Sequence, residues 1–184
     1  MKKILFGVFI SVFFIACNSG KEEKPTTTET AATTDNKKTG DEILAMSEGD
    51  EAKNSLLAFA KGDVNGMTAL YDDNVKFYWS GGDSLIGKKA VQDYYNGRWK
   101  LIDSLNIAGQ VVLPVKVNVS QTPGHTVGKW VLVWANIQVK YKNGKKLNFW
   151  AHNDYHYNDA GKVDVAIQYI DRHPLLEATK DLMK

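Results

Sequence analysis

Apolar and polar residues follow two different periods along the chain, and the change comes near residue 106. Upstream, apolar residues recur every three or four positions, as on one face of a helix; downstream, they alternate with polar residues, as on a strand. Asn143-Gly144 is typical of a two-residue hairpin turn. The pattern predicts helices over 42–63, 64–75 and 87–105, a short strand over 75–79, and long strands over 110–120, 129–142, 145–158 and 162–172.

Helices that precede an antiparallel meander predict an α+β domain, with the helices packed on one face of a curved sheet. The length allows one such domain, which we place at residues 43–184. With 23 basic and 21 acidic residues the charge is nearly balanced, so no nucleic-acid partner is expected. The single cysteine, Cys17, excludes an internal disulfide and a cysteine-rich metal site.

The first sixteen residues have the pattern of a signal peptide. Lys2 and Lys3 precede an apolar run over residues 4–16, which is too short to cross a hydrocarbon core of about 30 Å but suits the apolar region of a signal peptide. The run ends in Phe-Ile-Ala-Cys, which resembles the lipobox of bacterial lipoproteins and implies cleavage before Cys17 and acylation of its thiol, for example by palmitate. An uncleaved anchor with an incidental cysteine is the alternative.

Residues 17–42 are expected to form a flexible tether between this membrane anchor and the domain. Residues 20–42 contain seven threonines, many charges and no aromatic residue, so they bury too little apolar area to offset the entropy of ordering. Asn18, in place of Asp, favours the outer membrane, and Lys-Glu-Glu at 21–23 resembles the surface-export signal of Bacteroidetes lipoproteins. We expect a lipid-anchored protein of the cell envelope, with the side of the membrane left open.

Residues 51–173 resemble the SnoaL-like domains of the nuclear transport factor 2-like superfamily. The resemblance rests on the order and spacing of a Gly-Asp turn at 62–63, Leu-Tyr-Asp-Asp-Asn-Val at 70–75, Gly-x-x-Ala-Val at 87–91, Asp-Ala-Gly-Lys-Val at 159–163 and Tyr-x-Asp at 169–171. It implies a cone-shaped, cystatin-like fold, in which a bent antiparallel sheet wraps around the helices and leaves a pocket at the wide mouth. Within this fold, no cofactor is expected.

The family resemblance also indicates which face of the late strands lines the pocket. Limonene-type epoxide hydrolases of this fold carry an Arg-x-Asp pair and a further Asp at positions that align with Trp134, Asn136 and Gln168. The pocket would then lie on the even-numbered face of these strands. The three charged groups are replaced by Trp, Asn and Gln, so epoxide hydrolysis by that mechanism is disfavoured. The base of ketosteroid isomerases would fall near Tyr78 or Trp79, so that chemistry is disfavoured too.

His152 and Asp154 are the candidate catalytic residues on this face. A histidine beside a carboxylate can act as a general acid-base with a fixed tautomer. If 158–162 form the hairpin loop, paired positions sum to about 320, so His152 should lie beside Gln168 and Asp154 beside Ala166. The alternative is that both residues belong to a buried hydrogen-bond network or to a solvated rim.

The other candidate residues would bind a ligand rather than react with it. Neutral amides orient a ligand by hydrogen bonds but are poor proton-transfer groups, and indole and phenol rings suit a planar or apolar ligand. Core packing is the alternative for each ring. The proposed set consists of Trp79, Tyr94, Trp99, Trp134, Asn136, Trp150 and Gln168.

A metal ion is not expected at the histidines. His152 and His156 would lie about 13 Å apart along a strand, too far to share one ion. His156 is instead predicted to be a rim residue near Asp164 on the paired strand.

The odd-numbered face carries a row of Val, Ile, Tyr and Phe, which we expect on the outer side of the sheet. Exposed apolar surface of this kind favours a homodimer, as the family resemblance also implies. Shielding by a C-terminal helix over residues 174–184 is the alternative.

Three functions therefore remain open. The leading hypothesis is binding of a small, partly aromatic or hydrophobic molecule in the pocket. The second is an enzyme, a lyase, isomerase or cyclase with His152 as base and Asp154 as its orienting partner. The third is a surface interaction module with a vestigial cavity.

Overall fold

The computed structural model describes residues 42–43, 45, 47–119 and 126–183, which all belong to one compact unit. The expected signal peptide, Cys17 and the tether up to residue 41 lie outside the described residues, so the lipid anchor stays a prediction. Within the described ranges, no helix is both long enough and apolar enough to span a membrane.

The described strands form one mixed sheet in the order β1-β4-β5-β6-β7-β2-β3. Four long strands, β4 to β7, make the antiparallel meander expected from the alternating pattern, whereas β2 pairs with β7 in parallel. The strands are β1 Glu42–Ile43, β2 Tyr71–Trp79, β3 Ser84–Ile86, β4 Ile102–Val117, β5 Gly128–Tyr141, β6 Lys146–Tyr157 and β7 Val163–Tyr169. The helices are α1 Ser47–Ala60, α2 Val64–Met67, α3 Lys88–Trp99 and α4 His173–Thr179, which continues into a 3-10 turn, Lys180–Leu182.

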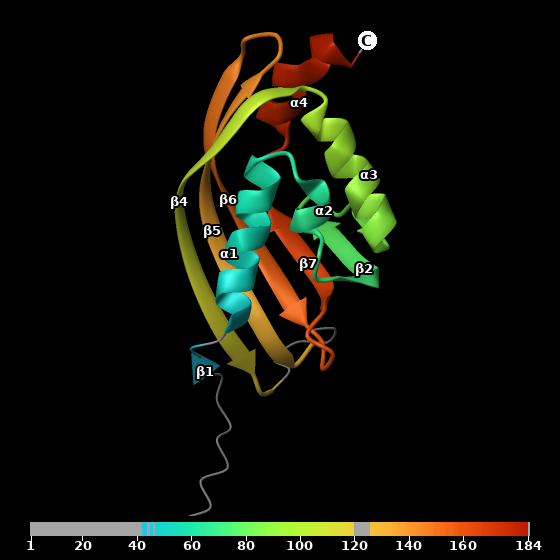
Figure 1. Ribbon diagram of the computed structural model, residues 1–184, viewed down its shortest axis with the longest axis vertical. Helices are drawn as coiled ribbons and strands as arrows, with labels where there is room; N and C mark the ends of the chain where they lie inside the picture. The colour runs from blue at the N-terminus through green and yellow to red at the C-terminus, as the bar shows by residue number, and fades with distance from the viewer. Residues whose placement is uncertain (1–41, 44, 46, 120–125, 184) are drawn as a thin grey trace, which may run out of the picture. The chain divides into compact units, whose positions relative to one another are not determined.

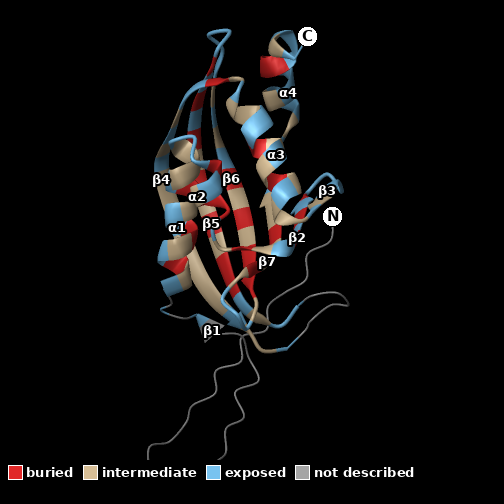
Figure 2. Cartoon of the chain, turned by 45° about the vertical axis from the view of Figure 1, so that its right-hand side comes forward, coloured by how far each residue is buried: buried red, intermediate tan, exposed pale blue. Residues whose placement is uncertain are grey.

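The helices α1, α2 and α3 lie on one face of the curved sheet (Figure 1). The core between the two layers is built from the odd-numbered residues of β5, and Val131, Val133 and Ala135 are fully buried there against α1 residues such as Leu56. Buried and less buried positions alternate along β5 and β6 (Figure 2), as expected for strands with one covered face. The β-branched row of β5 therefore faces inward, and its expected position on the outer side is wrong.

The even-numbered residues of β5 and β6 consequently lie on the outer face, which corrects the predicted direction of His152 and Asp154. The hairpin pairs Tyr157 with Val163, a sum of 320 as expected, but the register shifts immediately afterwards and His156 pairs with Val165. From that point the sum is 321. A bulge of one residue at Asp164 thus moves the following side chains of β7 to the opposite face.

The predicted helices are longer than the observed ones. The second helix ends at Met67 rather than at residue 75, because Tyr71 already joins the sheet opposite Val163. The third ends at Trp99 rather than at residue 105, because Ile102 pairs with Tyr141 and begins β4. Over three or four residues, the apolar positions of a strand can match the spacing expected for one turn of a helix. The hydrophobic pattern therefore did not show where each helix ends and the next strand begins.

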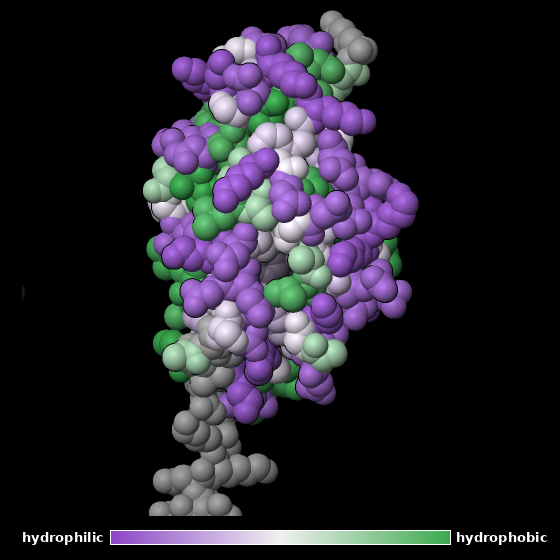
Figure 3. All heavy atoms as spheres, in the orientation of Figure 1, coloured by the Kyte–Doolittle hydropathy of each residue, from purple (hydrophilic) through white to green (hydrophobic). Residues whose placement is uncertain are grey.

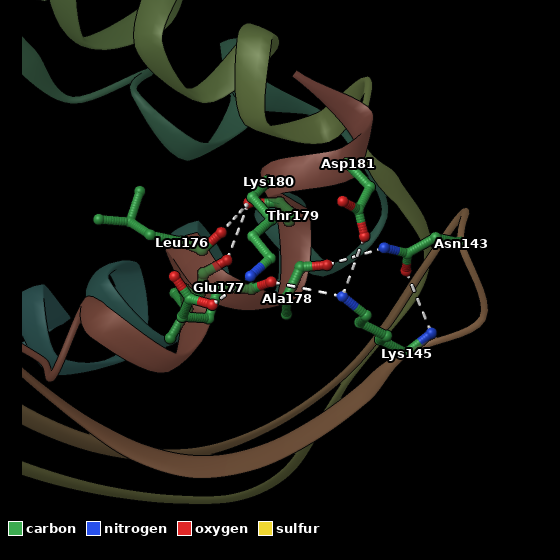
Figure 4. A network of polar contacts seen from close by, with 9 residues as sticks. Asn143, Lys145, Leu176, Glu177, Ala178, Thr179, Lys180 and Asp181 are labelled. Atoms are coloured by element: carbon green, nitrogen blue, oxygen red, sulfur yellow. Dashed lines mark hydrogen bonds and ion pairs between the residues drawn. The ribbon is translucent and has the colours of Figure 1, made fainter. Parts of the chain in front are cut away.

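Helix α4 packs at the end of the sheet where β5 turns into β6, and it does not shield the outer face. Its Ala178 is buried with Ile102, Val139 and Tyr141. Figure 4 shows how the hairpin turn holds this helix: the Asn143 side chain donates a hydrogen bond of 2.8 Å to the carbonyl of Ala178. The Lys145 ammonium reaches the Glu177 carbonyl and the Asp181 carboxylate.

Candidate functional site

A cavity of about 70 Å³ lies between the helices and the end of the sheet next to α4. Side chains from α1, α3, α4 and five strands surround it. The β5 and β6 residues among them are odd-numbered, so the cavity lies between the helices and the sheet as expected but on the opposite face of these strands from the one predicted. Its wall combines aromatic and aliphatic groups with two arginines and one amide. The lining residues are Phe59, Trp79, Tyr94, Tyr95, Arg98, Ile102, Leu105, Ile137, Val139, Tyr141, Phe149, Gln168, Ile170, Arg172 and Leu175.

Gln168 connects three elements at this cavity. Its side-chain oxygen accepts hydrogen bonds from the Trp79 indole at 3.1 Å and from the Tyr95 hydroxyl at 3.3 Å. Its side-chain nitrogen donates to the Asn153 amide oxygen at 3.0 Å. Because these three hydrogen bonds engage both the oxygen and the nitrogen of the Gln168 amide, its orientation is fixed. The amide is therefore a rigid part of the wall.

The two arginines give the cavity a positive charge. Arg172 lies over the Trp79 ring, 4.7 Å from the ring centroid, and forms an ion pair with the exposed Asp83 carboxylate. A guanidinium has five N–H donors, so this ion pair leaves others for a ligand. Arg98 lies near the Tyr141 hydroxyl: burial raises the pKa of that phenol, and the guanidinium opposes the shift. The lining residues include no Asp, Glu or His.

Four of the predicted ligand-binding residues lie at or beside this cavity. Trp79, Tyr94 and Gln168 line it, and the Trp79 and Tyr94 rings are 4.9 Å apart. Trp99 packs just behind, with its ring centroid 5.7 Å from that of Phe59. Its indole nitrogen is buried without a hydrogen-bond partner among the described residues.

The remaining candidates do not reach the cavity. Trp134 and Asn136 point to the outer face of β5, and Trp150, on β6, is 57% exposed there. The prediction of one shared site is therefore wrong for these three residues. The physical reason is that the apolar, β-branched row gains most from burial, so it faces the helices and turns the even-numbered row outward.

His152 and Asp154 also lie on the outer face and do meet each other. The distance between His152 Nε2 and Asp154 Oδ1 is 2.7 Å, although the two groups are not aligned as a hydrogen bond. The imidazole is stacked between Trp134 and Tyr169, with centroid distances of 4.4 and 5.3 Å. Burial raises the pKa of the Asp154 carboxyl, and His152 partly offsets this. The pair lies on the opposite side of the sheet from the cavity, and its catalytic role stays a prediction.

His156 contacts Asp164 as predicted, with 2.5 Å between Nδ1 and Oδ1. The His156 side chain is buried rather than at a rim. Its second ring nitrogen lies 3.1 Å from the Val127 carbonyl oxygen. In the described part of the chain, no group of three or more His, Cys, Asp or Glu side chains is arranged to hold a metal ion.

The arginines of the cavity were not identified from the sequence. Arg98 follows Tyr94 and Tyr95 by one helical turn on α3, so a helical projection of the aromatic face would have included it. Arg172 comes three residues after the end of β7 and carries no pattern of its own. Only the return of the chain at α4 brings it to the cavity.

No family model matches the sequence, and no curated protein matches it. Solved structures do match. A Pseudomonas putida protein provisionally assigned as a polyketide cyclase is 17% identical, with a TM-score of 0.57, over 73% of this chain and 98% of that one. A nuclear transport factor 2-like protein of unknown function from Burkholderia pseudomallei is 16% identical, with a TM-score of 0.54, over 72% and 98%.

A cystatin-fold protein from Novosphingobium aromaticivorans is 17% identical, with a TM-score of 0.50, over 67% of this chain and 98% of that one. At this level of identity, the likeness concerns the fold alone. The expected α+β class and the bent sheet around helices are confirmed by it. The fold of this chain is the nuclear transport factor 2-like, cystatin-like fold.

Proposed function

We propose that this chain is an exported lipoprotein whose SnoaL-like domain binds a small anionic molecule with an aromatic or apolar body. The observation that carries the proposal is the convergence of Arg98, Arg172 and the fixed Gln168 amide on one cavity lined otherwise by rings and aliphatic groups. Guanidinium groups match carboxylate, sulfonate and phosphate oxygens in charge and geometry. The aromatic walls favour a flat body on the same ligand.

The chemistry of the wall supports binding more than catalysis. A general acid or base must reach the reacting proton. The titratable lining groups are two arginines and three tyrosines, and the Tyr95 pKa is raised by burial. His152 and Asp154 lie on the outer face, so a substrate in the cavity could not reach them. The enzyme hypothesis would therefore require a separate substrate site on the outer face.

Ligand entry depends on α4 in this proposal. The cavity of about 70 Å³ is smaller than the pockets of about 300 Å³ or more that enclose drug-sized ligands. Leu175 of α4 forms part of its wall, and α4 is held by the Asn143 and Lys145 contacts with the hairpin turn and by the burial of Ala178. A ligand larger than a few atoms would displace this short helix.

Titration calorimetry with benzenesulfonate tests the proposal, with benzyl alcohol as the neutral probe. We expect benzenesulfonate to bind and Arg98→Met to weaken it by about tenfold or more, because a charge-assisted contact is lost. Lys89→Met, on the exposed side of α3, is the control and should leave binding unchanged. Equal affinity for both probes, or equal effects of both variants, would contradict an anion site.

The lipid anchor is the second part of the proposal, and the lipobox-like sequence before Cys17 supports it. Expression in a bacterial host with labelled palmitate should label the chain and place it in the membrane fraction. Cys17→Ser should remove both the label and the membrane association. Membrane association without label would favour an uncleaved anchor.

We also propose a homodimer, now through the outer face that carries Trp150 rather than through the β-branched row. Exposed apolar side chains on this face, Val111, Trp150 and Tyr169, support it.

A further inference from the structure

A second and larger cavity, of about 320 Å³, lies between α1, α2 and the β6–β7 hairpin. The two cavities occupy opposite ends of β6: Phe149 near its start lines the first, whereas Tyr155 and Tyr157 at its end line the second. The surface is hollowed beside α1 in the view of Figure 3, which has the orientation of Figure 1. Its volume falls at the lower limit of ligand pockets, so it suits a small molecule without rearrangement.

Small side chains create this cavity. Ala52, Ser55 and Ala58 recur every three residues along α1, and Ala69 lines the cavity from the segment after α2. Gly66 lets α1 and α2 approach closely, because a Cβ there would lie 3.1 Å from the Ala58 Cβ. Interiors are normally close-packed, so the small residues along α1 leave space that larger residues would fill. The wall itself is made of secondary structure. The hollow is therefore a fixed feature of the fold.

Three tyrosines form the floor and one carboxylate stands at the side. Tyr71, Tyr155 and Tyr157 are each at most 5% exposed. Burial, followed by the neighbouring Tyr155 phenol and the Glu51 carboxylate, raises the pKa of Tyr157, in keeping with the place of Glu51 in the lining beside this ring. Burial also raises the pKa of Tyr155, so the phenols stay neutral at ordinary pH.

The charge of this cavity is opposite to that of the first. Its lining contains Glu51 but no Lys, Arg or His, whereas the first contains two arginines and no carboxylate. Within the described residues, Glu51 forms no ion pair, although the Lys129 ammonium that is paired with Glu48 is close enough to interact with it electrostatically. A partly buried carboxylate beside neutral phenols favours binding of a cation, because the cation is attracted both to the negative charge of the carboxylate and to the faces of the aromatic rings.

We propose that the second cavity binds a small organic cation, an alkyl- or arylammonium, with its charged group at Glu51 and its apolar part against the tyrosine floor. The small residues of α1 and α2 set the size of the apolar part. This site is independent of the anion site proposed above, so the two proposals can fail separately.

The test is calorimetry and NMR with phenyltrimethylammonium as the probe and benzyl alcohol as its neutral counterpart. The cation should bind the wild-type chain and shift the ring resonances of Tyr155 and Tyr157. Glu51→Gln keeps the shape of the side chain and should weaken the cation by about tenfold, as for loss of a charge-assisted contact. Asp50→Asn removes a charge from the adjacent, exposed position of α1 and should leave the affinity unchanged.

Variants of the two cavities separate the possible outcomes. Arg98→Met should leave the cation affinity unchanged, and Glu51→Gln should leave benzenesulfonate binding unchanged. Circular dichroism and thermal unfolding verify that each variant is folded. The proposal is overturned if the wild-type chain does not bind the cation, if Glu51→Gln and Asp50→Asn have the same effect, or if the tyrosine resonances do not move.

Discussion

Gly128, the first residue of β5, shows how one position can depend on the absence of a side chain. Its φ of 126° lies in a region that residues with a Cβ rarely adopt. A Cβ built there would lie 2.8 Å from His156 Nε2. The imidazole cannot easily move away, because Asp164 and the Val127 carbonyl hold its two ring nitrogens. Backbone strain and a steric clash therefore coincide at this position.

Gly128→Ala is expected to lower the free energy of unfolding by about 1–3 kcal/mol, because the backbone conformation and the His156 contacts cannot both be kept. Urea unfolding followed by tryptophan fluorescence measures the change. Gly97→Ala is the matched control: no atom lies within 4 Å of its added Cβ and it sits within α3, so it should stabilise the chain by up to about 1 kcal/mol. A Gly128→Ala variant as stable as wild type would show that the ring is free to move.

At the scale of elements, the sequence predicts the type and order of the main elements well. The meander over β4 to β7 and the turn at Asn143-Gly144 follow from short-range patterns, and Gly144 has the positive φ, 82°, that such a turn requires. The short strand β3 was not expected. Its three residues are too few for any period to be visible.

The direction of the candidate site was less predictable than the elements. A bulge at Asp164 adds one residue to β7, and no local pattern announces it. It separates Gln168, which faces the cavity, from His152, which pairs with Tyr169 on the outer face. The side chain of the bulged Asp164 binds His156, so the bulge is stabilised by a contact between two strands. Such a contact depends on the fold and cannot be deduced from spacing.

The first turn of α1 is joined to the start of β5 by Glu48 and Lys129, whose charged atoms are 2.5 Å apart. The hydrogen bond from Lys129 lowers the pKa of the Glu48 carboxyl below its ordinary value of 4.5. A lowered carboxyl pKa stabilises the folded state at pH values above 4.5, and this contribution is lost as the pH falls through the lowered pKa. The ion pair therefore links the helix to the sheet at neutral pH but not in acid.

Glu48→Gln should accordingly destabilise the chain by up to about 1 kcal/mol at pH 7, because the Glu48 side chain is only 13% exposed although Lys129 is half exposed, and by almost nothing at pH 3. Chemical unfolding of both proteins at several pH values measures the difference. Asp93→Asn removes an ion pair in α3 that is exposed on both sides, so it should have a smaller effect at pH 7. A difference between Glu48→Gln and wild type that persists unchanged at pH 3 would exclude the ion pair as its source.

At the scale of the whole domain, the two faces of the sheet differ in what covers them. The inner face is covered by α1 and α3, while the outer face shows half-buried and exposed side chains, with Trp150 57%, Val111 56% and Tyr169 44% exposed. The rings of Trp134, His152 and Tyr169, which come from three adjacent strands, are stacked in a row across this face. Apolar side chains gathered on one surface are typical of protein interfaces, where aromatic residues are enriched.

If the chain self-associates through this face, the fraction of dimer should rise with protein concentration. Analytical ultracentrifugation of the wild-type chain should show a monomer–dimer equilibrium, and Trp150→Lys should shift it to monomer, because in a two-fold dimer each substitution places two charges in one interface. Leu57→Lys makes the same chemical change at an exposed apolar position of α1, on the opposite layer of the domain, and should leave the equilibrium unchanged. If the dimer persists in Trp150→Lys but dissociates in Leu57→Lys, the interface lies on the helical layer. A wild-type chain that stays monomeric at every concentration would contradict the proposal, because exposed aromatic rings that form a dimer interface must be buried against a second copy.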